Sequence, residues 1–315
     1  MSGRAGRGGR WGLTVGLIVG GAVLWGQAAP YFDGKAAFGL LEHQVAMGPR
    51  QPGSRGHAAL VQFLDDYLRP RADTVKVQTV TRTHPYRDDS LQITNILARF
   101  NPSARRHVLA LAHYDTRAVA DQDEVPANRG QPIMGANDGA SGVAVLLTLA
   151  EILAREAPPV GVDLLFVDAE DVGRSGDVDN FGLGTKAFIP AMTTLLDGAR
   201  PEYAVLLDMV GDAELELPME YYSYRDARAL VLRIWSLASD LGFAQFQSEV
   251  GAAVYDDHMP FLEAGIPAVD IIDIEYPNAE TNYWHTLEDT PDKCSPESLE
   301  AVGTVLTTLI YSERP

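Results

Sequence analysis

Five short motifs rich in aspartate, glutamate and histidine lie along the chain between residues 113 and 286. Four of them stand at or just beyond the end of an apolar, β-like run, and the fifth closes a loop. In an open α/β sheet, side chains at the carboxyl ends of strands converge on one crevice. Carboxylates and imidazoles gathered there predict a site for a divalent metal ion, with zinc as the first candidate. The motifs are His113-Tyr-Asp, Gly-Ala-Asn-Asp138-Gly, Asp-Ala-Glu170-Asp171, Leu-Asp208-Met-Val-Gly and Trp284-His285-Thr.

The apolar residues of the chain predict that strands and helices alternate. Apolar runs indicate strands at 91–100, 107–113, 162–167, 203–207 and 268–274. Apolar residues spaced three and four apart indicate helices at 35–47, 56–68, 140–156, 227–241 and 296–311. This alternation favours an α/β fold with a mostly parallel or mixed central sheet and helices on both faces. No repeat or linker divides residues 31–315, so we expect one domain.

Residues 1–30 have the composition of an export leader. Three arginines precede sixteen uncharged, mostly apolar residues, and Gly26 and Ala28 then offer a cleavage site. Sixteen helical residues span about 24 Å, which is short of the hydrocarbon core of a bilayer, about 30 Å thick. We therefore expect a cleaved signal peptide, with an uncleaved signal-anchor in the membrane as the alternative. In both cases residues 31–315 would be exported, to the periplasm or the cell exterior.

The composition excludes several classes of protein. The chain has 43 acidic and 25 basic residues, a formal charge of −18, so its surface repels nucleic acid. Its hydrophobic content of 46% is too low for a protein that crosses a membrane many times. Cys294 is the single cysteine, which excludes an internal disulfide and a thiolate metal cluster.

Residues from about 35 to 312 resemble the M28 zinc-peptidase clan and, within it, the bacterial glutaminyl-peptide cyclotransferases, or glutaminyl cyclases. Each motif alone is weak evidence, but five in family order are specific. The resemblance implies a zinc-aminopeptidase-like fold. It also implies a transferase that converts the N-terminal glutamine of a peptide or protein to pyroglutamate and releases ammonia. The motifs that carry it are His113-Tyr-Asp, Asn-Asp138-Gly-Ala-Ser, Leu-Asp208-Met-Val-Gly, Asp256-Asp257-His258-Met-Pro-Phe and Tyr-Trp284-His285-Thr.

The same resemblance implies one zinc ion, held by Asp138, Asp171 and His285. The family more often has glutamate where this chain has Asp171, and aspartate is one methylene shorter. Glu170 would be the general acid/base, and Trp284 would form an apolar wall against which the glutamine side chain stacks.

Further acids surround this set in the family pattern. Asp208 and Asp256 resemble the buried acids that flank the general acid/base and share a proton with it. Asp257 and His258 would brace their loop. Animal cyclases have a histidine in the strand where this chain has Asp270. Asp270 either takes a hydrogen-bonding role related to that of the histidine or has no role in the site.

The residues by themselves leave two points open. Asp138 suits the N-cap of the helix expected from residue 140, but nearby glycines, which let the backbone approach closely, favour a ligand role. If residues 170 and 171 were extended, their side chains would point in opposite directions, one towards a metal and one into a cavity.

A two-zinc aminopeptidase of the same clan is the main alternative function. There, counterparts of His113 and Asp208 bind a second metal ion, Asp138 bridges the two ions, and Glu170 would activate a metal-bound water. The cyclases keep similar residues but hold one zinc, so the identity of the ligands does not determine whether one or two zinc ions bind. The Trp284-His285 pair favours the cyclase, because peptidases of the clan usually carry a different aromatic residue there.

Overall fold

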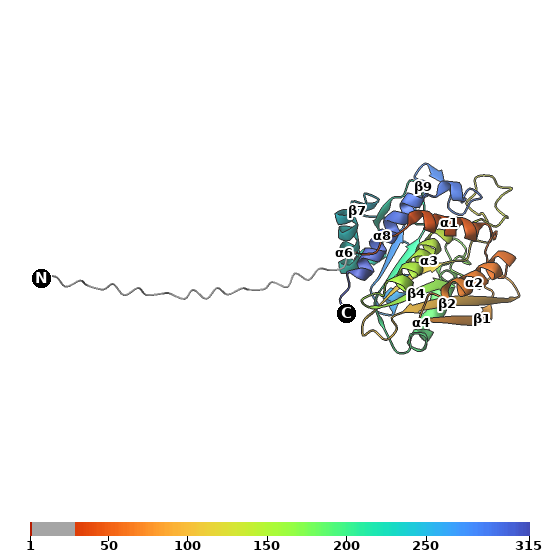
Figure 1. Ribbon diagram of the computed structural model, residues 1–315. Coiled ribbons are helices and arrows are strands. Elements are labelled where there is room, and N and C mark those ends of the chain that lie inside the picture. The colour runs from red at the N-terminus through yellow and green to blue at the C-terminus, as the bar shows by residue number, and fades with distance from the viewer. Residues whose placement is uncertain (2–28) are drawn as a thin grey trace.

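The computed structural model describes Met1 and residues 29–315, so the expected leader, residues 1–30, lies almost wholly outside the described residues. Within the described part, no helix is both long and apolar enough to cross a membrane. Figure 1 shows a central sheet with helices packed against its two faces. The predicted α/β class is confirmed.

The central sheet has six strands in the order β1-β2-β4-β3-β5-β8. Strands β3, β4, β5 and β8 run parallel, whereas β1 and β2 are antiparallel to their neighbours, so the sheet is mixed. Each strand predicted from an apolar run is present. The edge strand β1 was not predicted, because it is mostly polar and half-exposed. The strands are β1 (Thr74–Thr83), β2 (Ser90–Phe100), β3 (His107–His113), β4 (Gly161–Val167), β5 (Pro201–Asp208) and β8 (Ala268–Ile272).

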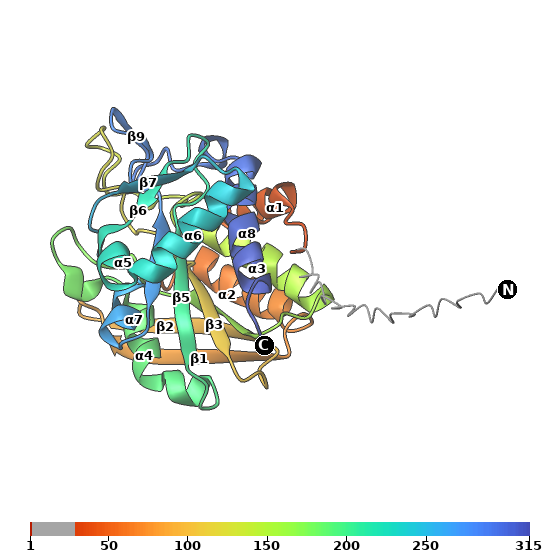
Figure 2. The same ribbon diagram turned by 90° about the vertical axis from the view of Figure 1, so that its left-hand side faces the viewer.

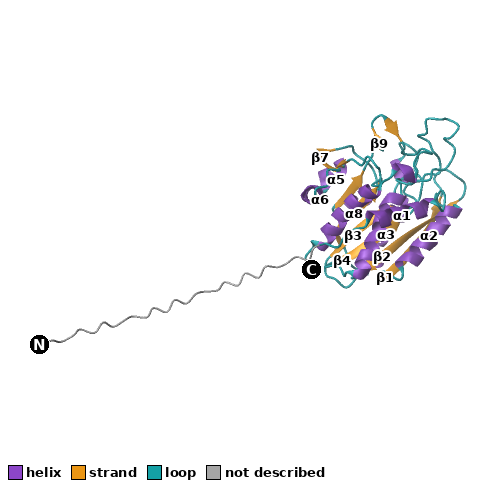
Figure 3. Ribbon diagram, turned by 45° about the horizontal axis from the view of Figure 1, so that its top comes forward, coloured by secondary structure: helices purple, strands orange, loops and turns teal. Residues whose placement is uncertain are grey.

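Helices α1 (Gly34–Val45), α2 (Arg55–Leu68), α3 (Ala140–Arg155) and α8 (Pro296–Tyr311) cover one face of the sheet and share its larger apolar core. Figure 3 shows them side by side. Helices α4 (Leu183–Leu195) and α7 (Met259–Glu263) cover the opposite face, where Phe188 and Phe261 pack on the strands. Helix α4 was not predicted, since glycines surround its start and Pro190 lies inside it.

The remaining elements lie beyond the β8 edge or in the loops above the sheet. Figure 2 shows α6 beside α8, with β6 and β7 near its end. Two short 3-10 helices, Val178–Asn180 and Pro291–Lys293, lie in loops that lead to α4 and α8. The elements beyond the edge and the small hairpin are β6 (Leu217–Met219), α5 (Tyr221–Asp226), α6 (Arg228–Leu241), β7 (Phe246–Val250), β9 (Pro277–Asn278) and β10 (Thr281–Asn282).

Candidate active site

The carboxyl ends of the parallel strands bring the predicted residues together. His113 is the last residue of β3 and Asp208 the last of β5, while Glu170 and Asp171 follow closely after β4. Asp138 differs from the expectation for its motif, because it precedes the N-cap residue of α3, Gly139, instead of following a strand. A long loop after β3 returns it to the same edge of the sheet.

The backbone turns sharply at three places beside the site. Ala169, Met209 and His285 have φ values of 56°, 48° and 56°, in the left-handed region that residues with a side chain seldom adopt. Ala169 directly precedes Glu170, and Met209 directly follows Asp208. Strain of this kind is kept where the surrounding structure holds the backbone for a functional arrangement.

Asp138, Asp171 and His285 form a buried group suited to a metal ion. Each offers one ligand atom, and these atoms all lie within 4.8 Å of one another. The Nε2 atom of His285 lies 3.2 Å from Oδ2 of Asp138 and 3.5 Å from Oδ1 of Asp171. The Oδ2 atoms of both aspartates are buried without a hydrogen-bond partner, which is costly unless a cation satisfies them. Two carboxylates and one imidazole are a donor set that fits zinc.

Asp138 does not cap helix α3. The N-cap position is Gly139, and no side chain caps the helix by a hydrogen bond. The nearby glycines allow two close approaches, because a Cβ on Gly142 would lie 2.2 Å from the carbonyl oxygen of Leu207 and one on Gly139 would lie 2.7 Å from that of Asp115. The first approach packs α3 against β5. The Asp138 carboxylate is left to face His113 and His285, which lower its pKa although burial opposes this.

His113 joins Asp138 to Asp208 in a second group with metal-ligand spacing. Its Nε2 atom lies 3.1 Å from Oδ1 of Asp208 and 3.2 Å from Oδ1 of Asp138. Burial opposes the charged imidazolium, but Asp208, Asp115 and Asp138 outweigh it and raise the pKa of His113. The contact between His113 and Asp208 has hydrogen-bond geometry.

Glu170 lies in a turn, so the expected extended geometry at residues 170 and 171 is wrong. Both side chains line one small cavity of about 70 Å³, and only Asp171 belongs to the metal-binding group. Burial, together with the charges of Asp256 and Asp171, raises the pKa of Glu170 well above its usual value. Other residues that line this cavity include Asp138, Phe181, Asp208, Tyr255, Asp256, Ile272, Trp284 and His285.

A cluster of buried acids begins at the cavity wall with Asp208 and Asp256 and extends to Asp270. Burial and the charge of Asp208 raise the pKa of Asp256 to about 7, and burial also raises the pKa of Asp208. Asp270, on β8, has both carboxylate oxygens buried without a hydrogen-bond partner, and its Oδ2 lies 3.6 Å from Nδ1 of His258. The other ring nitrogen of His258 lies 3.3 Å from Oε2 of Glu220. Closely spaced buried carboxyls of this kind must share protons.

Trp284 is half-buried and lines the cavity beside the proposed metal ligands. Its indole ring stacks on the ring of His285 at a centroid distance of 3.9 Å and an interplanar angle of 27°. It lines the same cavity as Glu170. An apolar side chain bound there would therefore contact the indole beside the metal-binding group.

Two carboxylates hold the site loops by backbone hydrogen bonds. Asp115 accepts the N–H groups of Glu170 and Asp171 at 3.0 and 3.2 Å. Asp289 accepts those of Asn137 and Asp138 at 2.8 and 3.2 Å. Asp115 belongs to the first motif, His113-Tyr-Asp, so the sequence marks it as a candidate functional residue. Asp289 lies in a polar loop outside the five motifs, and no feature of the sequence distinguishes it from a solvated aspartate.

Comparisons with known proteins agree with this geometry. Residues 95–310 match the model of peptidase family M28. Bovine glutaminyl-peptide cyclotransferase is 25% identical to this chain, over 83% of this chain and 77% of the relative. The structure of a glutaminyl cyclase from Bacteroides thetaiotaomicron, bound to N-acetylhistamine, is 32% identical, with a TM-score of 0.85, covering 91% of this chain and 100% of that one. A structure described as a Zn-dependent exopeptidase, from Parabacteroides distasonis, is 34% identical with the same TM-score and coverage.

The fold, the order of the motifs and the relatives point the same way. The family model matches more than two thirds of the chain, which assigns the chain to peptidase family M28. The glutaminyl cyclase structure, at 32% identity over 91% of this chain, places the chain among the glutaminyl cyclases of that family. The chain belongs to peptidase family M28 and, within that family, to the glutaminyl cyclases.

Proposed function

We propose that this protein converts the N-terminal glutamine of peptides or proteins to pyroglutamate and releases ammonia. The observation that carries the proposal is the placement of Glu170, outside the metal-binding group but in the same cavity as Asp171 and Trp284. A proton carrier, a cation site and an apolar wall thus meet in a space sized for one side chain. The curated relative and the structural neighbour that bear the cyclase name support this assignment.

Asp138, Asp171 and His285 would hold a single zinc ion. When bound, zinc supplies a Lewis acid that polarises the γ-carbonyl of the glutamine and stabilises the charge that develops on its oxygen. The one-ion proposal is supported by the difference between the two ligand groups. His113 already hydrogen-bonds Asp208, whereas Oδ2 of Asp138 and of Asp171 lack partners.

Glu170 would move the proton that the reaction must transfer. The nucleophile is the substrate's own α-amine, so the reacting groups are joined in one molecule and no activated water is needed. Glu170 takes a proton from this amine as the new C–N bond forms. It then gives the proton to the departing nitrogen as the old C–N bond breaks, and ammonia leaves.

Asp208 and Asp256 would orient Glu170 and keep a shared proton beside it. Their own raised pKa values favour such sharing, since not all three carboxyls can be charged at once. Trp284 would bind the methylene groups of the glutamine side chain and keep water away from the reacting carbonyl.

One comparison tests this function against the two-zinc aminopeptidase. The purified protein is analysed for zinc per chain and is offered a glutaminyl peptide and an aminoacyl anilide side by side. We expect one zinc and ammonia release with negligible anilide hydrolysis. Two zinc ions with anilide hydrolysis would assign the peptidase activity instead, a result that the second ligand group of His113, Asp138 and Asp208 makes worth testing.

We also propose that residues 1–30 direct export and that residues 31–315 act outside the cytoplasm. The arginines and the apolar run of the leader support this proposal. Mass spectrometry of the mature N-terminus tests it. A new terminus near residue 29 indicates cleavage, and a retained leader in the membrane fraction indicates an anchor.

A further inference from the structure

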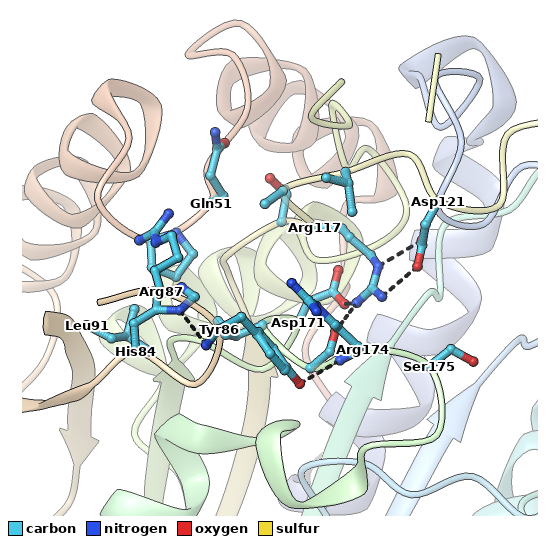
Figure 4. Close-up of a pocket in the computed structure, with 16 residues that line it drawn as sticks. Gln51, His84, Tyr86, Arg87, Leu91, Arg117, Asp121, Asp171, Arg174 and Ser175 are labelled. Carbon is cyan, nitrogen blue, oxygen red and sulfur yellow. Dashed lines mark hydrogen bonds and ion pairs between the residues drawn. The ribbon is translucent and has the colours of Figure 1, made fainter. Parts of the chain in front are cut away.

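Arg117 connects two of the three proposed zinc ligands from behind. Its Nη1 donates to Oδ1 of Asp171 at 2.7 Å and to the carbonyl of Gly173 at 2.9 Å. Its Nε and Nη2 donate to the two carboxylate oxygens of Asp121 at 2.9 and 2.8 Å. Oδ1 of Asp121 in turn lies 3.5 Å from Nδ1 of His285. Figure 4 shows the guanidinium between these carboxylates.

The contacts of Arg117 and Asp121 leave one atom of each ligand unused. Arg117 holds Oδ1 of Asp171, the oxygen that also lies 3.5 Å from Nε2 of His285, whereas Oδ2 of the same carboxylate is buried without a hydrogen-bond partner. Asp121 faces Nδ1 of His285, whereas Nε2 of that ring faces Asp138 and Asp171. Both ligands are therefore held in place while Oδ2 of Asp171 and Nε2 of His285 are bound by neither Arg117 nor Asp121.

The charges around Arg117 indicate that its effect is mainly on orientation. Its side chain is buried, and its guanidinium forms ion pairs with the carboxylates of both Asp121 and Asp171. The guanidinium and a divalent cation would together carry three positive charges, and Asp121, Asp138 and Asp171 carry three negative charges. Since this group as a whole is close to neutral, the Arg117–Asp121 pair adds little net charge at the metal. What it adds is a planar fork with two fixed directions.

We propose that Arg117 is a positioning residue that sets the orientation of Asp171 directly and of His285 through Asp121. The proposal rests on the proposed function only in taking these residues as zinc ligands. Outer hydrogen-bond partners of this kind typically change metal affinity or activity by about 10–100-fold.

The cavity beside Arg117 makes the proposal testable by chemical rescue. A pocket of about 550 Å³ reaches the guanidinium from the outer side and is lined by Arg117, Asp121, Asp171 and Arg174 among other residues. Truncating Arg117 would open space in this pocket beside Oδ1 of Asp171 and the carboxylate of Asp121. Free guanidinium ion could then occupy the place of the lost fork.

The experiment compares full-length Arg117→Ala, Arg117→Lys and Arg174→Ala variants with the wild type. Arg174 is the matched control, because it lines the same pocket but is exposed and stacks its guanidinium on Tyr86, 4.2 Å from the ring centroid. Zinc affinity is measured by competition with a chelator, with and without guanidinium chloride at about 20 mM, far below the molar concentrations that unfold proteins. The melting temperature of each metal-free variant is measured in parallel.

We expect Arg117→Ala to weaken zinc binding by about 10–100-fold, with recovery of much of that loss on addition of guanidinium. Arg117→Lys should also lose affinity, because lysine keeps the charge but cannot bridge both carboxylates. Arg174→Ala should bind zinc like the wild type.

Two results would overturn the proposal: wild-type zinc affinity in Arg117→Ala, or a loss that guanidinium does not reverse and that follows a fall in the metal-free melting temperature. If Arg117→Ala does not fold, Arg117→Lys decides the matter by the same affinity measurement. Failure of the proposed function would look different, since wild-type protein would then bind zinc without releasing ammonia from a glutaminyl peptide.

Discussion

Replacing Glu170 with glutamine is the most direct test of the proposed chemistry. Glutamine has nearly the same shape and volume, so the cavity stays filled, and the backbone N–H of residue 170 can still donate to Asp115. Glu170 does not belong to the group formed by Asp138, Asp171 and His285. The substitution therefore removes one ionisable proton carrier and leaves the proposed ligands in place.

The size of the effect follows from the role of the residue. Burial and the neighbouring carboxylates Asp256 and Asp171 raise the pKa of Glu170 above its ordinary value. A positioned acid/base typically contributes about 10²–10⁴-fold to the rate. Since tenfold corresponds to about 1.4 kcal/mol, Glu170→Gln should remove about 3 to 5 kcal/mol of transition-state stabilisation.

The assay is ammonia release from a glutaminyl peptide, with zinc per chain measured on the same preparation. We expect kcat to fall by about 10²–10⁴-fold, with KM and zinc content close to the wild type. Glu275→Gln is the matched control, because Glu275 is exposed on the loop that follows β8, and its kcat should not change. Near-wild-type kcat in Glu170→Gln with full zinc content would refute the proton-transfer role.

Three further predictions follow from the same geometry. Asp171→Asn should leave the protein folded but with little zinc after dialysis, measured by elemental analysis, and full zinc retention would remove Asp171 from the ligand set. Trp284→Ala should raise KM for a glutaminyl peptide by about 2- to 12-fold, the equivalent of roughly 0.5–1.5 kcal/mol of stacking, and an unchanged KM would argue against a substrate wall. Burial, followed by the charge of Asp256, raises the pKa of Asp257 to about 8 in the folded protein, against about 4 when unfolded. The folded state therefore holds a proton that the unfolded chain releases above pH 4, so Asp257 destabilises the fold increasingly as the pH rises towards 8. Asp257→Asn should then raise the melting temperature of the metal-free protein more at pH 8 than at pH 5, and equal shifts at both pH values would contradict the raised pKa.

Local sequence pattern predicted most of the elements. The bounds of β3 and α8 agree with the prediction at both ends, and α3 differs by one residue. These elements carry strong apolar periodicity, which depends only on neighbours along the chain. The apolar pattern did not predict β1, because this edge strand is polar and little buried. It did not predict α4 either, because that helix begins among glycines and contains Pro190, residues that usually interrupt helices.

The candidate site divides in the same way. Residue types and motif order predicted a set of acids and histidines, and the structure brings Asp138, Asp171 and His285 within ligand distance. Their roles stay predictions until they are measured. The backbone contacts of Asp289 and the fork of Arg117 had no such signal, because an aspartate or arginine in a polar loop is usually solvated.

The sequence by itself determined which chemistry this protein can attempt, since only carboxylates and imidazoles in these motifs could bind a cation and move a proton. The tertiary structure alone decided which of them meet. His113 faces Asp208 because β3 and β5 are parallel neighbours, and Asp138 reaches the same edge only because α3 packs closely on β5 at Gly142. Strand order and helix packing depend on contacts between distant residues, and no local pattern of side chains records those contacts.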